Sequence, residues 1–326
     1  MNVEKGCVDA PIQSEIDICK AIKNLKKEKD AVILAHYYQK GEIQDLADFI
    51  GDSLALARIA EKLPNKIIVL CGVHFMGETA KILCPEKKVL VPDLNAGCSL
   101  ADSCEASAFE DFIKEHPNAI VVSYVNTSAG VKALTDVVVT SSNASQIVEA
   151  LPKDREIIFG PDRNLGNYIS SSTGRDMYIW DGACHVHEQF SLEKIVELKK
   201  KYPNAKLLVH PECKKSLVLL ADKVGSTAAL LKYAQTSTAK EFIVATESGI
   251  LHEMQKSCPD KMFIPAPPTD STCGCNDCNF MKLNTLEKLY NCLLYEQPEI
   301  KVERDIAEKA RLPIRKMIEM SEQLGI

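Results

Sequence analysis

The stretch DAVILAHYYQ (residues 30–39) decides the fold, because it recurs in altered form twice further along the chain. It is a short apolar run, rich in β-branched residues, that closes on polar residues, which is typical of a buried parallel strand. NAIVVSYVNT (118–127) and NAKLLVHPEC (204–213) have the same form. The chain therefore contains three units that each begin with a buried strand.

Each unit continues in the same order after its first strand. A Ser or Thr precedes an amphipathic helical stretch, as an N-cap would, and a second and a third strand follow. The third strand of each unit runs into a cysteine. The helical stretches are 51–63, 140–151 and 225–234, the second strands lie in 66–80, 156–169 and 241–254, and the third strands lie in 88–98, 176–184 and 261–278.

Strand, helix, strand, helix, strand is a parallel α/β pattern. We predict an α/β protein of three homologous small parallel-sheet α/β domains around a pseudo-threefold axis. The predicted domains are 1–104, 105–190 and 191–326, the last including a helical tail that packs back on the body. Because open parallel sheets bind ligands at the carboxyl ends of their strands, we expect one active site where the three sets of strand ends meet.

The composition excludes several classes of protein. The 326 residues carry a net charge of -6, which gives no broad basic surface for nucleic acid. No apolar run reaches membrane length and the first residues do not form a secretory signal, so we expect a cytoplasmic protein with no membrane partner. Thirteen cysteines in a reducing compartment favour metal binding or catalysis over disulfides.

Aligning the units places polar pairs, two residues apart, at the end of each first strand. Such pairs point to the same side of a strand, so all six side chains are expected in one cavity. One of them alone would more often be a satisfied polar group of the core, but three equivalent pairs favour a function. The pairs are His36 and Tyr38, Tyr124 and Asn126, and His210 and Glu212.

The helix starts add a set of hydroxyls, Ser53, Ser141 and Thr227, with Ser226 beside the last. Hydroxyls and free backbone N–H groups at a helix N-terminus bind anions. Each residue alone would be a plain N-cap. Together with the polar pairs, they predict a substrate rich in carboxylate or phosphate.

The third set is Cys98, Cys184 and Cys278, one cysteine per unit. Three converging thiolates can hold zinc, or an iron–sulfur cluster with one iron that the protein does not ligate. An open iron is a Lewis acid that promotes dehydration. The spacing of the cysteines in the sequence leaves both metals open.

The chain resembles the quinolinate synthase family in an ordered set of short stretches from about residue 30 to 290. The stretches are AHYYQ (35–39), GDS (51–53), FMGETAKIL (75–83), NAGCS (95–99), YVNTSA (124–129), PDRNLG (161–166), CHVHE (184–188), HPEC (210–213), GST (225–227) and CNFMKLNTLEKL (278–289).

The resemblance implies a 4Fe–4S cluster on Cys98, Cys184 and Cys278 and the condensation of iminoaspartate with dihydroxyacetone phosphate to quinolinate, with loss of phosphate and water, in NAD biosynthesis. An aspartate oxidase or dehydrogenase is the implied source of iminoaspartate. We choose Cys278 over Cys273 and Cys275 because an aromatic–Met step followed by NTL, which the family shares, lies just after it.

On this resemblance, Tyr38, His210 and Glu212 are the acid–base candidates. His187 follows Cys184 by three residues. It either faces the cavity or hydrogen-bonds to a residue that ligates the metal. A zinc- or redox-sensing binding protein and a different cluster-dependent hydro-lyase are the alternatives. The predicted substrate-binding residues are His36, Ser53, Tyr124, Asn126, Ser141, His187, Ser226 and Thr227.

Overall fold

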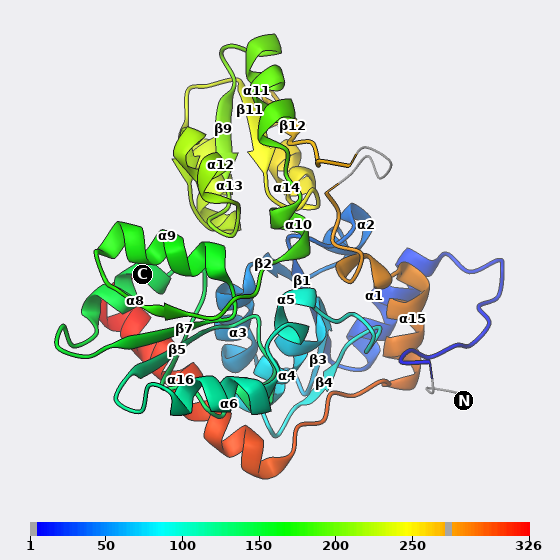
Figure 1. Ribbon diagram of the computed structural model, residues 1–326. Helices are drawn as coiled ribbons and strands as arrows, with labels where there is room; N and C mark the ends of the chain where they lie inside the picture. The colour runs from blue at the N-terminus through cyan, green and yellow to red at the C-terminus, as the bar shows by residue number, and fades with distance from the viewer. Residues whose placement is uncertain (1–4, 271–275) are drawn as a thin grey trace.

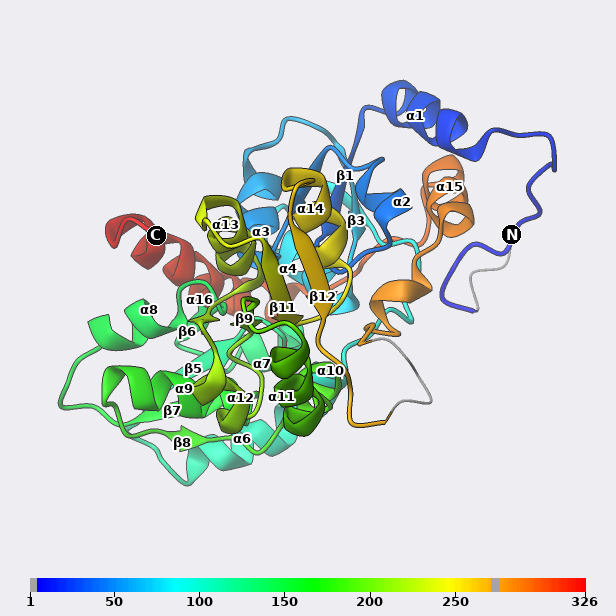
Figure 2. The same cartoon turned by 90° about the horizontal axis from the view of Figure 1, so that it is seen from above.

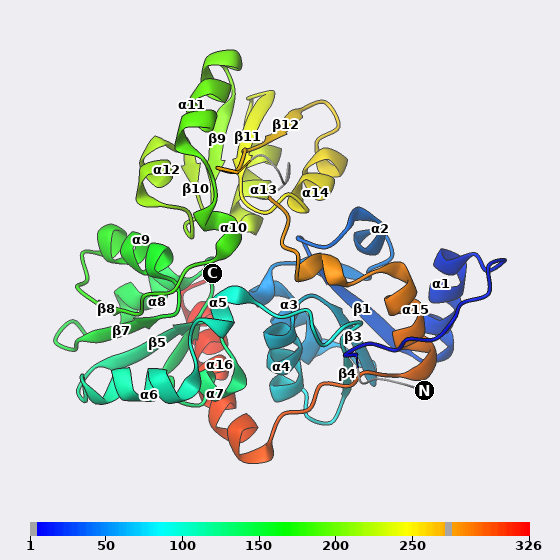
Figure 3. The ribbon, with the colours of Figure 1, turned by 45° about the vertical axis from the view of Figure 1, so that its right-hand side comes forward.

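The computed structural model describes residues 5–270 and 276–326 and contains three four-stranded sheets in three lobes around a common centre (Figures 1 and 3). All strand pairs within the sheets are parallel. The predicted α/β class and its three repeated parallel units are confirmed. The three sheets have one topology, with the strand orders β2-β1-β3-β4, β6-β5-β7-β8 and β10-β9-β11-β12.

The helices and strands of the three units follow one another in equivalent order. The first unit contains α1 (Ile18–Glu28), β1 (Ala31–His36), α2 (Gly41–Gln44), β2 (Phe49–Gly51), α3 (Ser53–Lys62), β3 (Ile67–Cys71), α4 (His74–Leu83), β4 (Lys88–Leu90) and α5 (Ser99–Asp102). The second contains α6 (Ala106–Lys114), β5 (Ile120–Tyr124), α7 (Ala129–Lys132), β6 (Val137–Val139), α8 (Ala144–Ala150), β7 (Ile157–Gly160), α9 (Arg163–Thr173), β8 (Tyr178–Ile179) and α10 (His185–Glu188). The third contains α11 (Leu192–Lys201), β9 (Lys206–Val209), α12 (Lys215–Leu220), β10 (Lys223–Val224), α13 (Thr227–Thr236), β11 (Glu241–Ala245), α14 (Ile250–Ser257), β12 (Met262–Pro265) and the 3-10 helix η1 (Met281–Leu283).

Each sheet has a short edge strand that the sequence pattern did not predict. The prediction of three strands per unit was therefore wrong. β2, β6 and β10 are only two or three residues long, too short to stand out as apolar runs. An aspartate directly before each edge strand accepts the backbone N–H of a first-strand residue fifteen positions earlier. The pairs are Asp48 with Ile33, Asp136 with Val121 and Asp222 with Leu207, each at 2.8 Å.

The predicted N-caps are correct at one helix of the three. Ser226 caps α13, but Asp52 rather than Ser53 caps α3, and Ser141 lies before α8, which begins at Ala144. Aspartate is at least as good an N-cap as serine, which explains the shift by one residue at α3. As a consequence, the hydroxyl of Ser53 is not used for capping and remains available to a ligand.

The helical tail packs on the first and second units, although it follows the third in the sequence. α15 (Leu286–Tyr295) lies beside α1, and α16 (Arg304–Gln323) packs against β6 and α7, where Ile314 and Met317 are fully buried in a core that the first two units share (Figure 2). The predicted domain boundaries stay a prediction. None of the helices formed by residues 5–270 and 276–326 is both long and apolar enough to span a bilayer.

Candidate active site and metal centre

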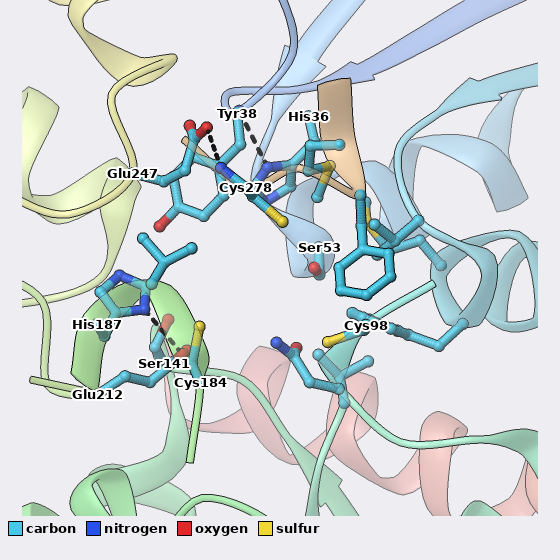
Figure 4. Close-up of a pocket in the computed structure, with 18 of the residues that line it drawn as sticks. His36, Tyr38, Ser53, Cys98, Ser141, Cys184, His187, Glu212, Glu247 and Cys278 are labelled. Atoms are coloured by element: carbon cyan, nitrogen blue, oxygen red, sulfur yellow. Dashed lines mark hydrogen bonds and ion pairs between the residues drawn. The ribbon is translucent and has the colours of Figure 1, made fainter. Parts of the chain in front are cut away.

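The strand ends of the three sheets surround one pocket with an empty volume of about 730 Å³ (Figure 4). Ser226 is not part of its lining, because this side chain turns to the backbone of α13 as the N-cap. The chemical roles of the other residues stay predictions. The predicted residues that line the pocket are His36, Tyr38, Ser53, Cys98, Tyr124, Asn126, Ser141, Cys184, His187, His210, Glu212, Thr227 and Cys278.

The pairs from the first-strand ends converge, but not through strand alternation as predicted. β1 ends at His36 and β9 ends before His210, so Tyr38 and Glu212 lie in the turns that follow. In each turn the backbone N–H of the second residue donates to Nδ1 of the histidine, from Tyr38 at 3.1 Å and from Glu212 at 3.4 Å. This bond folds both side chains of a pair toward the pocket.

Glu212 lies at the centre of a buried network and is only 3% exposed. Its Oε1 accepts a hydrogen bond from the Tyr124 hydroxyl at 2.6 Å, and its Oε2 lies 3.1 Å from His187 Nδ1 without the alignment of a hydrogen bond. Burial alone would raise the pKa of Glu212, but His187, His210 and the Tyr124 hydroxyl bring it below its usual value. The carboxylate is therefore ionised and able to accept a proton.

Tyr38 belongs to the same network through a threonine that the sequence analysis missed. Its hydroxyl lies 2.7 Å from both Thr227 Oγ1 and Thr246 Oγ1, and Thr246 Oγ1 lies 3.0 Å from His187 Nε2. Burial and the charge of Glu212 raise the pKa of Tyr38 well above its usual value, so the phenol keeps its proton. A chain of hydroxyl and imidazole groups thus joins a phenol to a carboxylate.

Two of the pocket histidines, His36 and His210, are neutral near pH 7. Burial lowers the pKa of His36 to about 4 and that of His210 to about 3. The rings of His187 and His210 stack with their centroids 4.6 Å apart, and His210 Nε2 lies 3.3 Å from Ser141 Oγ. Because a neutral imidazole can both accept and donate a proton, His210 suits a site that moves protons.

The three cysteine thiols point into the same space (Figure 4). Cys98 and Cys184 directly precede α5 and α10, Cys278 lies just before η1, and the backbone of the turn that follows each cysteine acts to lower the pKa of its thiol. Burial nevertheless raises the pKa of Cys98 to about 12 and that of Cys278 to about 11, and raises that of Cys184 well above its usual value. Thiolates at these positions need a bound cation.

The distances between ligand atoms distinguish two candidate metal sites in this pocket. In the part of the chain that the structure describes, the one group of three His, Cys, Asp or Glu ligand atoms within 4.8 Å of each other is Cys184, His187 and Glu212. Thiolates on one zinc lie within about 4.6 Å, because a Zn–S bond is about 2.3 Å. The sulfurs of Cys98, Cys184 and Cys278 are therefore too far apart for a single ion. The alternative ligands Cys273 and Cys275 lie outside the described residues.

Comparison with known proteins identifies the family of the chain. The family model described as quinolinate synthetase A protein matches residues 20–319. The chain belongs to the quinolinate synthase family. The quinolinate synthase of Nostoc punctiforme is 59% identical over 306 residues, which are 94% of each chain. The enzymes of Chloroherpeton thalassium and Microcystis aeruginosa are 55% and 57% identical over 94% of this chain and over 96% and 95% of theirs.

Sequence reasoning missed several polar residues at this site, among them Thr246, Glu247 and His185. Thr246 and Glu247 follow the second strand of the third unit, whereas the predicted polar pairs lie at the ends of the first strands. His185 directly follows Cys184, and its Nδ1 lies 2.7 Å from Oγ of Ser99, which directly follows Cys98. The polar run TES (246–248) and the polar residue after two of the cysteines were the available signals.

Ser141 and Thr227 provide a test of anion binding in this pocket. We expect Ser141→Ala and Thr227→Ala each to weaken binding of a phosphorylated or dicarboxylic ligand by about ten- to a hundredfold, since a hydrogen bond to a charged group contributes about 1.5–3 kcal/mol. Thr227→Ser is the matched control, because it keeps the hydroxyl that also contacts Tyr38. Ligand affinity is measured by calorimetry. Equal losses for a neutral analogue would contradict an anion-binding role.

Gly249 of α14's N-terminal turn tests how tightly Tyr38 must be held. A Cβ at Gly249 would lie 2.8 Å from Tyr38 Cα and carbonyl carbon, so Gly249→Ala must displace the turn that carries the phenol. We expect kcat to fall by roughly ten- to a hundredfold, because small misplacements of reacting groups have effects of this size. The same Cβ would lie 2.9 Å from Glu247 Oε2, so kcat is compared per cluster rather than per chain. A kcat within twofold of the parent would show that the position of Tyr38 is not critical.

Proposed function

We propose that this pocket condenses iminoaspartate with dihydroxyacetone phosphate to quinolinate, with loss of phosphate and water, as a step of NAD biosynthesis. Membership of the quinolinate synthase family makes the chain an enzyme of this class. The observation that carries the detailed proposal is the convergence of three partly buried cysteines, three hydroxyls and a carboxylate–imidazole network on one pocket, contributed by all three units.

We assign a 4Fe–4S cluster to Cys98, Cys184 and Cys278. Their buried thiols require a cation to ionise, their sulfurs are too widely spread for one ion, and backbone N–H groups already point at each sulfur. Three protein ligands leave one of the four irons open, and that iron supplies a Lewis acid for a substrate oxygen. The fit of the residues to the cluster supports the assignment.

The side chains around the cluster position divide into binding and proton-transfer groups. Ser53, Ser141 and Thr227 donate hydroxyl hydrogen bonds to phosphate or carboxylate oxygens, and Asn126 donates its amide beside them. Phe75 and Met76 line the same pocket and exclude water, which strengthens those bonds.

Proton transfer falls to the buried network. Glu212, which is ionised, accepts a proton from the substrate, and Tyr38, which keeps its proton, donates one to a leaving oxygen. Thr246 and His187 lie between these two groups and return the proton from the carboxylate to the phenol after each cycle. His210, stacked on His187, orients that imidazole.

Iminoaspartate is an imine and hydrolyses in water, so the substrate must be made nearby. An aspartate oxidase or an aspartate dehydrogenase is the class of partner that produces it. The cysteines of the described residues are all free thiols, which supports a reducing, cytoplasmic location.

A zinc-dependent binding protein is the second candidate, favoured by the close approach of Cys184, His187 and Glu212. Metal and sulfide analysis of anaerobically purified protein separates the two. We expect about four irons and four sulfides per chain and a brown colour that oxygen bleaches. A colourless protein with one zinc per chain would support the second candidate.

The substrates are tested by anaerobic turnover with the product measured by chromatography. We expect quinolinate from iminoaspartate and dihydroxyacetone phosphate, and none when dihydroxyacetone replaces its phosphate ester. Dehydration of a hydroxy acid without quinolinate formation would instead identify a hydro-lyase.

A further inference from the structure

Buried carboxylates hold the backbone of two of the three cysteines. Asp162 Oδ2 accepts a hydrogen bond from the backbone N–H of Cys184 at 3.2 Å, and Glu247 Oε1 accepts one from the backbone N–H of Cys278 at 3.0 Å. Both carboxylate side chains have no exposed surface. Neither residue takes part in the proposed proton transfer or substrate binding.

The two carboxylates occupy the same position of the repeat. Asp162 lies two residues after the end of β7, and Glu247 lies two residues after the end of β11. Val73 holds this position after β3 in the first unit, so the equivalent side chain there is not a carboxylate. Asp162 and Glu247 therefore make the same contact, to the backbone N–H of a cysteine, in two units.

Glu247 also ties the third cysteine to the first unit. Lys282 Nζ lies 2.9 Å from Glu247 Oε1 and donates to the carbonyl oxygen of Tyr38 at 2.7 Å. Glu247 Oε2 accepts from the backbone N–H of Gly249, which packs directly on the Tyr38 backbone, at 2.7 Å. Figure 4 shows Glu247 beside Tyr38 and Cys278. One ion pair thus joins a cysteine of the third unit to the turn that carries Tyr38.

Stability alone is a weak reason for such groups. Burial raises the pKa of both carboxyl groups, that of Asp162 well above its usual value, and a charge on either group disfavours the thiolate of the cysteine near it. Their carboxyl oxygens nevertheless give the backbone N–H of each cysteine a fixed acceptor, and Lys282, 2.9 Å from Glu247 Oε1, favours the charged and stronger form of that acceptor at Cys278. Cys278 needs such an anchor most, because its segment leaves the sheet at Pro265, farther from its cysteine than in the other units.

We propose that Asp162 and Glu247 are positioning residues that fix Cys184 and Cys278 for the cluster, and that Lys282 keeps Tyr38 in register with Cys278 through Glu247. The proposal rests on the cluster assignment made above. It predicts that removing either carboxylate loosens the cluster, whereas removing the lysine disturbs catalysis more than cluster retention.

The test uses the reconstituted full chain and follows visible absorbance under anaerobic conditions with an iron chelator and no substrate. Glu247→Gln and Asp162→Asn put an NH2 group where one carboxylate oxygen accepted a backbone N–H. We expect both to lose the cluster about tenfold faster than the parent, or more. Asp162→Ser is a milder variant, because its hydroxyl can still cap α9 at Leu165 while no oxygen reaches Cys184.

Lys282→Met should keep the cluster half-life within about threefold of the parent while kcat falls at unchanged iron content.

Asp222→Asn is the matched control for the carboxylate variants, because Asp222 also accepts a backbone N–H, from Leu207 at 2.8 Å, and pairs with Lys199 at 3.0 Å. It lies at the opposite end of the third sheet, so we expect a lower melting temperature and an unchanged cluster half-life.

Two results would overturn the inference. One is a parental cluster half-life in Glu247→Gln and in both Asp162 variants; the other is an equally fast loss in Asp222→Asn, which would show a global effect of stability. A parent chain that takes up no iron and sulfide would instead refute the cluster assignment itself.

Discussion

Glu212→Gln is expected to lower quinolinate formation by at least about a hundredfold while the cluster colour and substrate binding persist. The glutamine keeps the size of the side chain and an oxygen for the Tyr124 hydroxyl, which now donates to Glu212 at 2.6 Å. It removes the ionised oxygen beside His187, and with it the base at the end of the buried network. Positioned acid–base groups contribute about a hundredfold or more to a rate.

The decisive quantity is the single-turnover rate of the fully clustered variant under anaerobic conditions. A rate within about threefold of the parent would remove Glu212 from the mechanism and leave it a structural role at the end of β9. Tyr38→Phe should lower the rate similarly, because the phenol is the group that keeps its proton at this site. Thr227 and Thr246 lose their shared partner in that variant, so its melting temperature is measured alongside.

Changing Cys98, Cys184 or Cys278 to Ser is expected to abolish both the brown colour and the activity. Each unit contributes one cysteine to the pocket. Among the described residues no other cysteine lines the pocket, so no second thiol is in place to replace a lost ligand. The fold should survive, because the hydrophobic cores of the three units form without a metal, unlike that of a zinc finger. Iron content and circular dichroism measure the two effects.

Other cysteines provide the controls for this prediction. They lie outside the pocket lining, so their replacement should leave the iron content unchanged. A full cluster in Cys278→Ser together with its loss in Cys275→Ser would show that the third ligand was assigned to the wrong residue. The control residues are Cys7, Cys19, Cys84, Cys104 and Cys292.

The fold and half of the pocket lining could be predicted because both repeat. A long buried strand such as β1 is visible as an apolar run, and its repeated polar ending marks His36, Tyr124 and His210 as equivalent. The edge strand β2 could not be found this way, because three residues of which one is exposed form no apolar pattern. Its signal was the aspartate that precedes it, repeated as Asp48, Asp136 and Asp222.

What the sequence could not show are the contacts between units. Lys282 meets the carbonyl oxygen of Tyr38 across 244 positions of the chain, and Tyr124 meets Glu212 across 88. Both contacts depend on how the three sheets face one another, which no periodicity within a unit encodes. The N-cap of α3 was predicted wrongly for a local reason, because Asp52 and Ser53 are both favoured N-cap residues.

The central claim is that the cluster held in this pocket carries out the formation of quinolinate, and a bleaching titration tests it most directly. Aliquots of the reconstituted protein are exposed to limited oxygen, returned to anaerobic conditions, and assayed for intact cluster and for quinolinate formed from iminoaspartate and dihydroxyacetone phosphate. We predict a rate proportional to intact cluster that falls to zero with it and returns on reconstitution. Quinolinate formation that continues at the full rate in bleached, iron-free protein would contradict the account.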